Sequence, residues 1–268
     1  MDHYNIAQGL ADRAAHTPFQ PGIILPAGRD RQGQAKFTQL SFRQMNEQCD
    51  RYAHGLSKHG IARGQRVLLL IRPGTELITV TFALMKIGAV PVLIDPGMGR
   101  KAFLQCVSET APKAMISIPL AHLLRRVFPK SFKTVKYAFS VGKRRFPGTI
   151  HLEKACPPCS TPFPVTTTTV EDEAAIAFTS GGTGIPKGVL YLQGMFREVI
   201  RALGEDLDMA KGEVHLAAMY IFALFNPALG VTTVIPDMDA RKTAQVNPAY
   251  LVEAIQTHGV TLSMGSPT

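Results

Sequence analysis

The stretch "RVLLLIRPGTELITVTFALMKIGAVPVLIDPG", residues 66–97, determines the class of fold. Its two ends, residues 66–71 and 90–94, are short runs of leucine and β-branched residues next to glycine and proline, which is typical of buried strands. Between them, apolar residues recur at helical spacing over residues 75–87, and Gly88 follows as a helix-ending glycine. A strand, a helix and a second strand in this order indicate parallel strands.

The same stretch contains a long apolar segment, residues 77–94, whose length alone is compatible with a membrane span. Lys86 lies in the middle of this segment, and Gly88 and Pro91 interrupt it before the second strand begins. We therefore expect a buried helix followed by a buried strand, and no transmembrane segment.

The alternation of helices and strands continues downstream. Residues 100–109 and 120–128 have helical patterns, whereas residues 114–118 and 135–141 are short apolar strands. Strands separated by helices of this length form parallel sheets that helices cover on both faces. The predicted fold class is therefore α/β, with mostly parallel sheets.

A segment rich in proline and threonine, "ACPPCSTPFPVTTTTV" at residues 155–170, interrupts this pattern. Cys156 and Cys159 have C-x-x-C spacing, but a redox or metal site would need a helix start or a second pair of ligands. We interpret the segment as a linker. It divides the chain into a first α/β subdomain, residues 1–154, and the start of a second, residues 171–268.

The overall composition indicates a folded globular protein, with 46% hydrophobic and 18% charged residues. Four cysteines in 268 residues are too few for a disulfide framework, so we expect reduced thiols. The N-terminus, "MDHYNIAQGLADRAAH", has neither the basic leader nor the apolar core of a signal peptide. Both features favour a cytoplasmic location.

The formal net charge of +9 is concentrated in residues 110–152, which we call the basic segment. It contains no aspartate or glutamate, and its nine basic residues are Lys113, Arg125, Arg126, Lys130, Lys133, Lys136, Lys143, Arg144 and Arg145. Such a segment attracts nucleic acid, anionic lipid or an acidic carrier protein. We favour a solvated basic face and expect no nucleic-acid partner, because no nucleic-acid-binding motif accompanies it.

The motif "FTSGGTGIPKGV", residues 178–189, follows a predicted strand at residues 173–178. Glycines bring backbone N–H groups close to an oxyanion, hydroxyl groups add donors, and lysine adds a positive charge. The spacing matches neither the Walker A loop nor the dinucleotide fingerprint G-x-G-x-x-G. We predict a different polyphosphate-binding loop, made by Thr179, Ser180, Gly181, Gly182, Thr183, Gly184 and Lys187.

This motif resembles the phosphate-binding signature of the adenylate-forming (AMP-binding) superfamily, which includes acyl-CoA synthetases, luciferases and peptide-synthetase adenylation domains. Further segments resemble the branch that forms β-lactones in long-chain olefin biosynthesis. They are "DPG" at residues 95–97, "FALFNPALG" at 222–230, "VIPDMD" at 234–239 and "GSP" at 265–267.

The resemblance implies an enzyme that uses ATP, with Mg²⁺, to convert a carboxylic acid to an acyl-adenylate and pyrophosphate. In the β-lactone branch, the internal hydroxyl of a long-chain 3-hydroxy acid then displaces AMP. By motif match, Thr179, Ser180, Thr183 and Lys187 hold the departing pyrophosphate, and Lys187 is the candidate catalytic residue. An aromatic cluster either borders the acyl pocket or packs in the core: Tyr220, Phe222 and Phe225.

Two positions depart from the family pattern. Gly182 replaces a usual serine or threonine, and Leu192-Gln193 stands where a histidine is common. The family's adenine- and ribose-binding segments, most of its Mg²⁺ ligands and its C-terminal domain lie further along than residue 268. We therefore expect an N-terminal portion of the enzyme that is inactive alone and self-associates through apolar surface that the rest of the enzyme would bury.

Three alternatives remain open. The parent protein is a β-lactone-forming enzyme, or it is a fatty acid-CoA ligase or acyl-AMP ligase. A third alternative belongs to another class: a non-catalytic nucleotide-binding module that keeps the phosphate loop without the chemistry.

Overall fold

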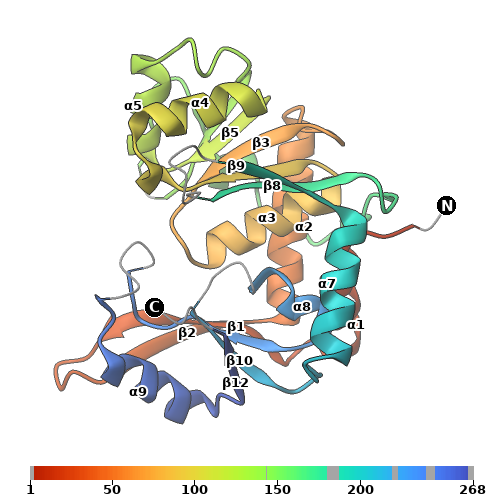
Figure 1. The fold of residues 1–268 in the computed structure, drawn as a ribbon, viewed down its shortest axis with the longest axis vertical. Helices are drawn as coiled ribbons and strands as arrows, with labels where there is room; N and C mark the ends of the chain where they lie inside the picture. The colour runs from red at the N-terminus through yellow and green to blue at the C-terminus, as the bar shows by residue number, and fades with distance from the viewer. Residues whose placement is uncertain (1–2, 143, 180–186, 219–222, 240–244, 265–268) are drawn as a thin grey trace. The chain divides into compact units, whose positions relative to one another are not determined.

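The structure is a computed structural model that describes residues 3–142, 144–179, 187–218, 223–239 and 245–264 (Figure 1). The chain forms two compact units, and each is discontinuous in sequence. The first unit comprises Met1–Asn5, Cys49–Arg72 and Val80–Phe196, and the second comprises Ile6–Gln48, Pro73–Thr79 and Arg197–Thr268.

The first unit contains a seven-stranded sheet with the order β7-β6-β5-β3-β4-β8-β9. All neighbouring strands are parallel except β8 and β9. The four strands predicted upstream of the linker are confirmed with small shifts at their ends. The seven strands are β3 (Arg66–Leu70), β4 (Val90–Ile94), β5 (Ala114–Ser117), β6 (Tyr137–Ser140), β7 (Ile150–His151), β8 (Glu173–Thr179) and β9 (Lys187–Leu192).

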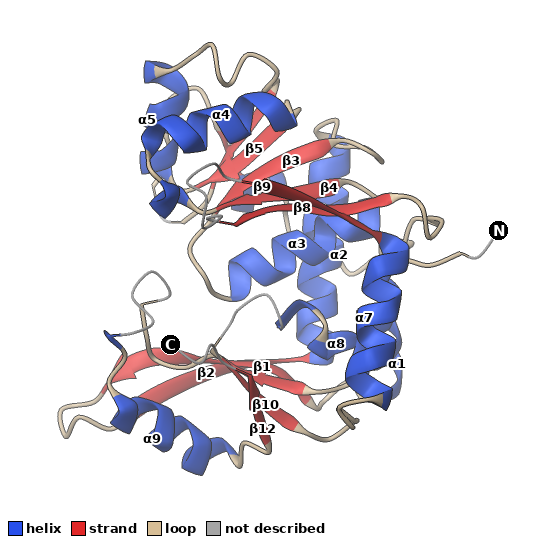
Figure 2. Ribbon diagram, in the orientation of Figure 1, coloured by secondary structure: helices blue, strands red, loops and turns tan. Residues whose placement is uncertain are grey.

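Helices cover both faces of this sheet, as the sequence predicts. On one face, α4 and α5 pack on a core cluster that includes Leu68, Val92 and Met115. Successive side chains of a strand point to opposite faces of the sheet, so Val67 and Leu69 lie on the second face, where both are buried. Figure 2 shows α2 and α3 on that second face. The helices that lie wholly or mostly in this unit are α2 (Phe42–Lys58), α3 (Thr75–Ile87), α4 (Arg100–Thr110), α5 (Pro119–Val127) and α6 (Leu152–Ala155).

The second unit contains a five-stranded sheet with the order β12-β10-β11-β1-β2. Only β1 and β2 are antiparallel, and the other neighbours are parallel. Its strands are β1 (Pro21–Arg29), β2 (Ala35–Ser41), β10 (Val214–Ala217), β11 (Thr232–Val234) and β12 (Leu262–Met264). The remaining described α-helices are α1 (Ile6–His16), α7 (Gln193–Glu205), α8 (Asn226–Leu229) and α9 (Pro248–His258).

The division into units differs from the division at residues 155–170 that the sequence suggests. Residues 156–168 contain no helix or strand, but β8 follows them and pairs in parallel with β4. The Asn5 side chain also donates to the Thr166 carbonyl oxygen at 2.9 Å. This pairing returns the chain to the first sheet, so residues on both sides of the segment share one unit.

Lys86 forms an ion pair with Asp50, and both side chains are buried between α2 and α3. This pair explains how a lysine is accommodated in the apolar segment at residues 77–94. The segment folds as α3 and β4. Among the described residues, no helix combines the length and the apolar character that a membrane span requires.

Lys86→Met removes the cation of this buried ion pair and retains the buried Asp50 carboxylate. We expect the free energy of unfolding to fall by about 3–5 kcal/mol. The double variant Lys86→Met/Asp50→Leu removes both charges and should lose clearly less, because no uncompensated charge stays buried. Urea unfolding followed by far-UV circular dichroism measures both variants, with the exposed Lys58→Met as the control. Equal losses in the single and double variants would contradict the role of the ion pair.

Candidate functional site

The carboxyl ends of β4 and β8 lie at the same edge of the first sheet. The two strands are parallel neighbours, and their register places Ile94 opposite Phe178. The Asp95 turn and Thr179 come directly after these positions, so both lie at this edge. Ligands of open α/β sheets bind outside the carboxyl ends of the strands. We call this edge, with the Asp95 turn and the loop after β8, the candidate site.

The glycine-rich loop is closed at its base by an antiparallel pair of strands. Thr179 at the end of β8 is paired with Lys187 at the start of β9. The Lys187 side chain is exposed, which leaves its ammonium group accessible to a bound anion. The remaining predicted loop residues lie outside the described residues: Ser180, Gly181, Gly182, Thr183 and Gly184.

Gly188 is required by the packing of this strand pair. It lies directly across from Phe178, and a Cβ atom at Gly188 would lie 2.8 Å from the Phe178 ring. Phe178 belongs to the buried core cluster of the sheet, so its ring has little room to move. The glycine therefore lets the strand after the loop lie close to the core.

The turn after β4 is held by its own aspartate. The Asp95 carboxylate accepts a hydrogen bond from the Gly97 N–H at 2.8 Å and caps a short 3₁₀ helix, η1 (Pro96–Met98). Met98 then packs against the core cluster before α4 begins. The "DPG" motif thus fixes the chain beside the candidate loop by an Asx-type hydrogen bond.

The second unit contains a buried polar network next to one predicted pocket residue. Phe225 is buried, whereas Tyr220 and Phe222 lie outside the described residues. The Asn226 amide donates to the Thr233 hydroxyl at 2.8 Å and lies 3.0 Å from Nδ1 of His215. Burial lowers the pKa of His215, which favours the neutral ring.

Sequence reasoning did not identify this network. In the sequence, each of the three residues is a polar residue inside an apolar run. Their contact with one another depends on the pairing of β10 with β11, which the sequence does not show. A buried amide that is hydrogen-bonded to side chains of neighbouring strands fixes the local backbone. The network therefore positions the segment that carries Phe225.

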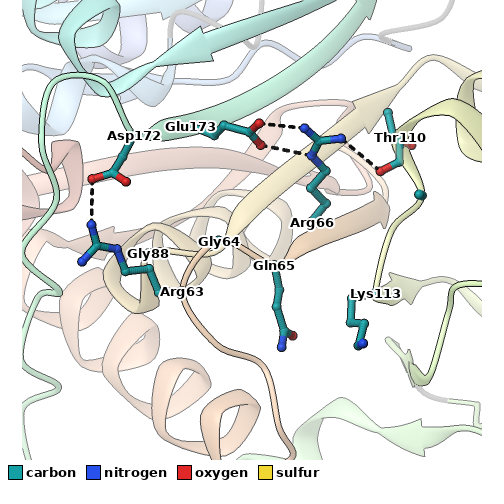
Figure 3. A pocket seen from close by; sticks show the side chains of 10 residues that line it. Arg63, Gly64, Gln65, Arg66, Gly88, Thr110, Lys113, Asp172 and Glu173 are labelled. Carbon is teal, nitrogen blue, oxygen red and sulfur yellow. Dashed lines mark hydrogen bonds and ion pairs between the residues drawn. The ribbon is translucent and has the colours of Figure 1, made fainter.

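A pocket of about 480 Å³ lies at the opposite, amino-terminal edge of the first sheet (Figure 3). Arg66 makes two hydrogen bonds to Glu173, at 3.0 and 2.7 Å, and Arg63 binds Asp172 at 2.9 Å. The carboxylates in this pocket are thus neutralised by arginines. The pocket is distinct from the candidate site, because Glu173 begins β8 and Thr179 ends it.

The described residues also include no group of three or more His, Cys, Asp and Glu side chains placed to hold a metal ion. Cys156 is buried, Cys159 is exposed, and both are free thiols. Burial raises the pKa of the Cys156 thiol to about 12, which disfavours the reactive thiolate.

Comparisons with known proteins agree with the resemblance identified from the motifs. Residues 13–268 match the AMP-binding enzyme family. The chain is 43% identical to an olefin beta-lactone synthetase of Stenotrophomonas maltophilia over 98% of its own length and 48% of the relative. It is 41% identical to the olefin beta-lactone synthetase of Xanthomonas campestris, with the same coverage of 98% and 48%. The chain thus spans about half the length of these relatives.

Solved structures share the fold. A putative long-chain-fatty-acid CoA ligase from Rhodopseudomonas palustris superposes with a TM-score of 0.81 at 21% identity, covering 99% of this chain and 64% of that one. A long-chain-fatty-acid-CoA ligase from Archaeoglobus fulgidus gives a TM-score of 0.79 at 20% identity, with coverage of 98% and 52%. At these identities the likeness concerns the fold alone.

Gly188→Ala brings a methyl group against the Phe178 ring, so we expect the free energy of unfolding to fall by about 1–3 kcal/mol. Gly204→Ala is the matched control, because a Cβ atom there would meet no atom closer than 3.4 Å. Urea unfolding followed by circular dichroism compares the two variants. If Gly188→Ala were as stable as Gly204→Ala, the close packing of the strand pair would be refuted.

Proposed function

The chain belongs to the AMP-binding enzyme family, and we propose that it forms the N-terminal part of an ATP-dependent acid-activating enzyme. The proposed reaction converts a carboxylate and ATP to an acyl-adenylate and pyrophosphate. One observation carries the proposal: a glycine- and hydroxyl-rich loop that joins paired residues Thr179 and Lys187 at the carboxyl edge of a parallel sheet. We also infer that the enzyme acts in the cytoplasm.

In this reaction the carboxylate oxygen attacks the α-phosphorus of ATP. The bond between the α-phosphorus and the oxygen that bridges it to the β-phosphate breaks, and pyrophosphate leaves. Negative charge increases on the departing pyrophosphate, so donors and cations placed around it lower the barrier. We assign this role to the Lys187 ammonium group, to the hydroxyl groups of Thr179, Ser180 and Thr183, and to the N–H groups of Gly181, Gly182 and Gly184. Holding the two reactants in line supplies the remaining acceleration.

ATP enters such a reaction as its Mg²⁺ complex. Mg²⁺ is usually held by one or two carboxylates together with the substrate phosphates, and we propose that most of its protein ligands lie in the C-terminal part of the complete enzyme. The proposed contribution of the chain is to bind the phosphates and the acyl group.

For the substrate we propose a long-chain 3-hydroxy acid, and for the product a β-lactone. The 41–43% identity to two olefin beta-lactone synthetases supports this choice over CoA ligation. In the second step, the β-hydroxyl oxygen attacks the acyl carbonyl carbon and loses its proton, and AMP leaves as the acyl–phosphate bond breaks. Phe225 is the described candidate for the border of the acyl pocket, and the proposal includes Tyr220 and Phe222.

Lys187→Ala in the complete enzyme should reduce acid-dependent exchange of pyrophosphate into ATP by about 10²–10³-fold, because charge stabilisation of the leaving group is lost. The exposed Lys58→Ala serves as the control for loss of a surface charge. Circular dichroism verifies that both variants fold. Exchange that is absent from the unmodified complete enzyme would instead support a non-catalytic nucleotide-binding module.

Product analysis separates the two enzyme alternatives. The complete enzyme is incubated with ATP, CoA and a long-chain 3-hydroxy acid, and products are identified by mass spectrometry and infrared spectroscopy. We expect the strained-ring carbonyl of a β-lactone, with no dependence on CoA. A CoA thioester as the product would refute β-lactone formation and leave acid activation intact.

A further inference from the structure

Helix α5 presents an apolar stripe to solvent. Leu120, Leu123 and Val127 are 73%, 46% and 58% exposed. Their spacing of three and four residues places them on one face of the helix. A surface helix of a globular protein usually carries polar residues on its outer face. An exposed apolar stripe therefore indicates a surface that contacts another apolar surface.

The opposite side of α5 is firmly packed on the first unit. Ala121 and Leu124 pack against the core cluster of the sheet. The His122 ring is buried and its Nε2 lies 2.9 Å from the Phe139 carbonyl oxygen. The contacts of the inner face therefore fix the orientation of α5, with the stripe on the solvent side.

Basic side chains surround the stripe. Arg126 lies on α5 and Lys130 lies three residues after its end, and both are exposed. The loop with the exposed Arg144 and Arg145 lies against α5, because Arg125 donates to the Gly148 carbonyl oxygen at 3.4 Å. The His122 ring also stacks on Phe146 of this loop. The basic segment contains no carboxylate side chain that could neutralise these charges.

We propose that α5 and the adjoining basic segment bind the surface of an anionic phospholipid membrane. Aliphatic side chains that insert at the acyl boundary, together with lysine and arginine near the phosphates, are the features of interfacial helices. This role extends beyond the proposed reaction and does not depend on it.

The composition of this surface favours lipid over a protein partner. Protein interfaces are enriched in aromatic residues, methionine and arginine and depleted in lysine, and leucine and valine are under-represented among their energetically dominant residues. Here the stripe consists of leucine and valine, and lysines follow it at Lys130 and Lys133. Single-stranded nucleic acid would require aromatic stacking side chains, which the stripe lacks.

The chain contains no tryptophan, so Leu120→Trp introduces a single fluorescent reporter in the stripe. Vesicles of phosphatidylcholine alone are compared with vesicles that also contain phosphatidylglycerol. We expect a blue shift of emission with the anionic vesicles only, reversed by high salt because the attraction is screened. Phe19→Trp is the matched control, since Phe19 is 79% exposed in the second unit, and its emission should shift less.

Charge reversal tests the basic residues. Arg126→Glu/Lys130→Glu should lower partitioning onto anionic vesicles, measured by co-sedimentation, by at least about fivefold for each basic charge removed. Arg31→Glu/Lys36→Glu makes the same change in net charge at exposed residues of the second unit and should retain most of the binding. Equal losses in the two variants would indicate attraction by net charge alone and overturn the assigned surface.

Three further results would overturn the proposal. The first is the absence of any shift of the Leu120→Trp emission with anionic vesicles. The second is a dimer in light scattering that Leu120→Ser converts to a monomer, which would assign the stripe to self-association. The third is loss of vesicle binding in a longer natural chain that carries this sequence, which would show that another segment covers α5.

Discussion

The parallel pairing of β4 with β8 is the constraint on which the first unit depends. It returns the chain to the sheet after the proline-rich segment and places Ile94 beside Phe178. Because both strands run in the same direction, the Asp95 turn and the loop after Thr179 must emerge at one edge. If β8 paired elsewhere, the same residues would retain their local conformations but the candidate site would not form.

The two ends of β8 have different electrostatic surroundings. At its amino end, the Arg66 guanidinium binds the Glu173 carboxylate through two hydrogen bonds, so opposite charges are matched within the protein. At its carboxyl end, paired Thr179 and Lys187 bracket a loop rich in glycine, and the lysine side chain is exposed. A cation held at the end of a rigid strand pair is suited to an external anion, because the strands fix its backbone before binding.

The sequence predicts the elements whose signals are local. The helix at Thr75–Ile87 and the strand at Val90–Ile94 have the predicted bounds, because periodicity and flanking glycine determine them within one short stretch. The β1–β2 pair and the five-stranded sheet were not predicted, since β1 pairs with β11 from a distant part of the chain. The loop motif was found by its chemistry, but the contact of Gly188 with Phe178 depends on strand register, which composition does not reveal.

For the basic segment, the structure adds an observation that depends on contacts between distant residues. From the sequence, a solvated basic face is favoured. In the chain, α5 connects β5 to β6, which lie toward the end of the sheet that finishes with β7. There the sheet and α4 cover only the side with Ala121 and Leu124, and Leu120, Leu123 and Val127 stay exposed. Basic side chains alone indicate a surface in contact with water. Basic side chains around an exposed apolar stripe favour a position at the interface between water and lipid.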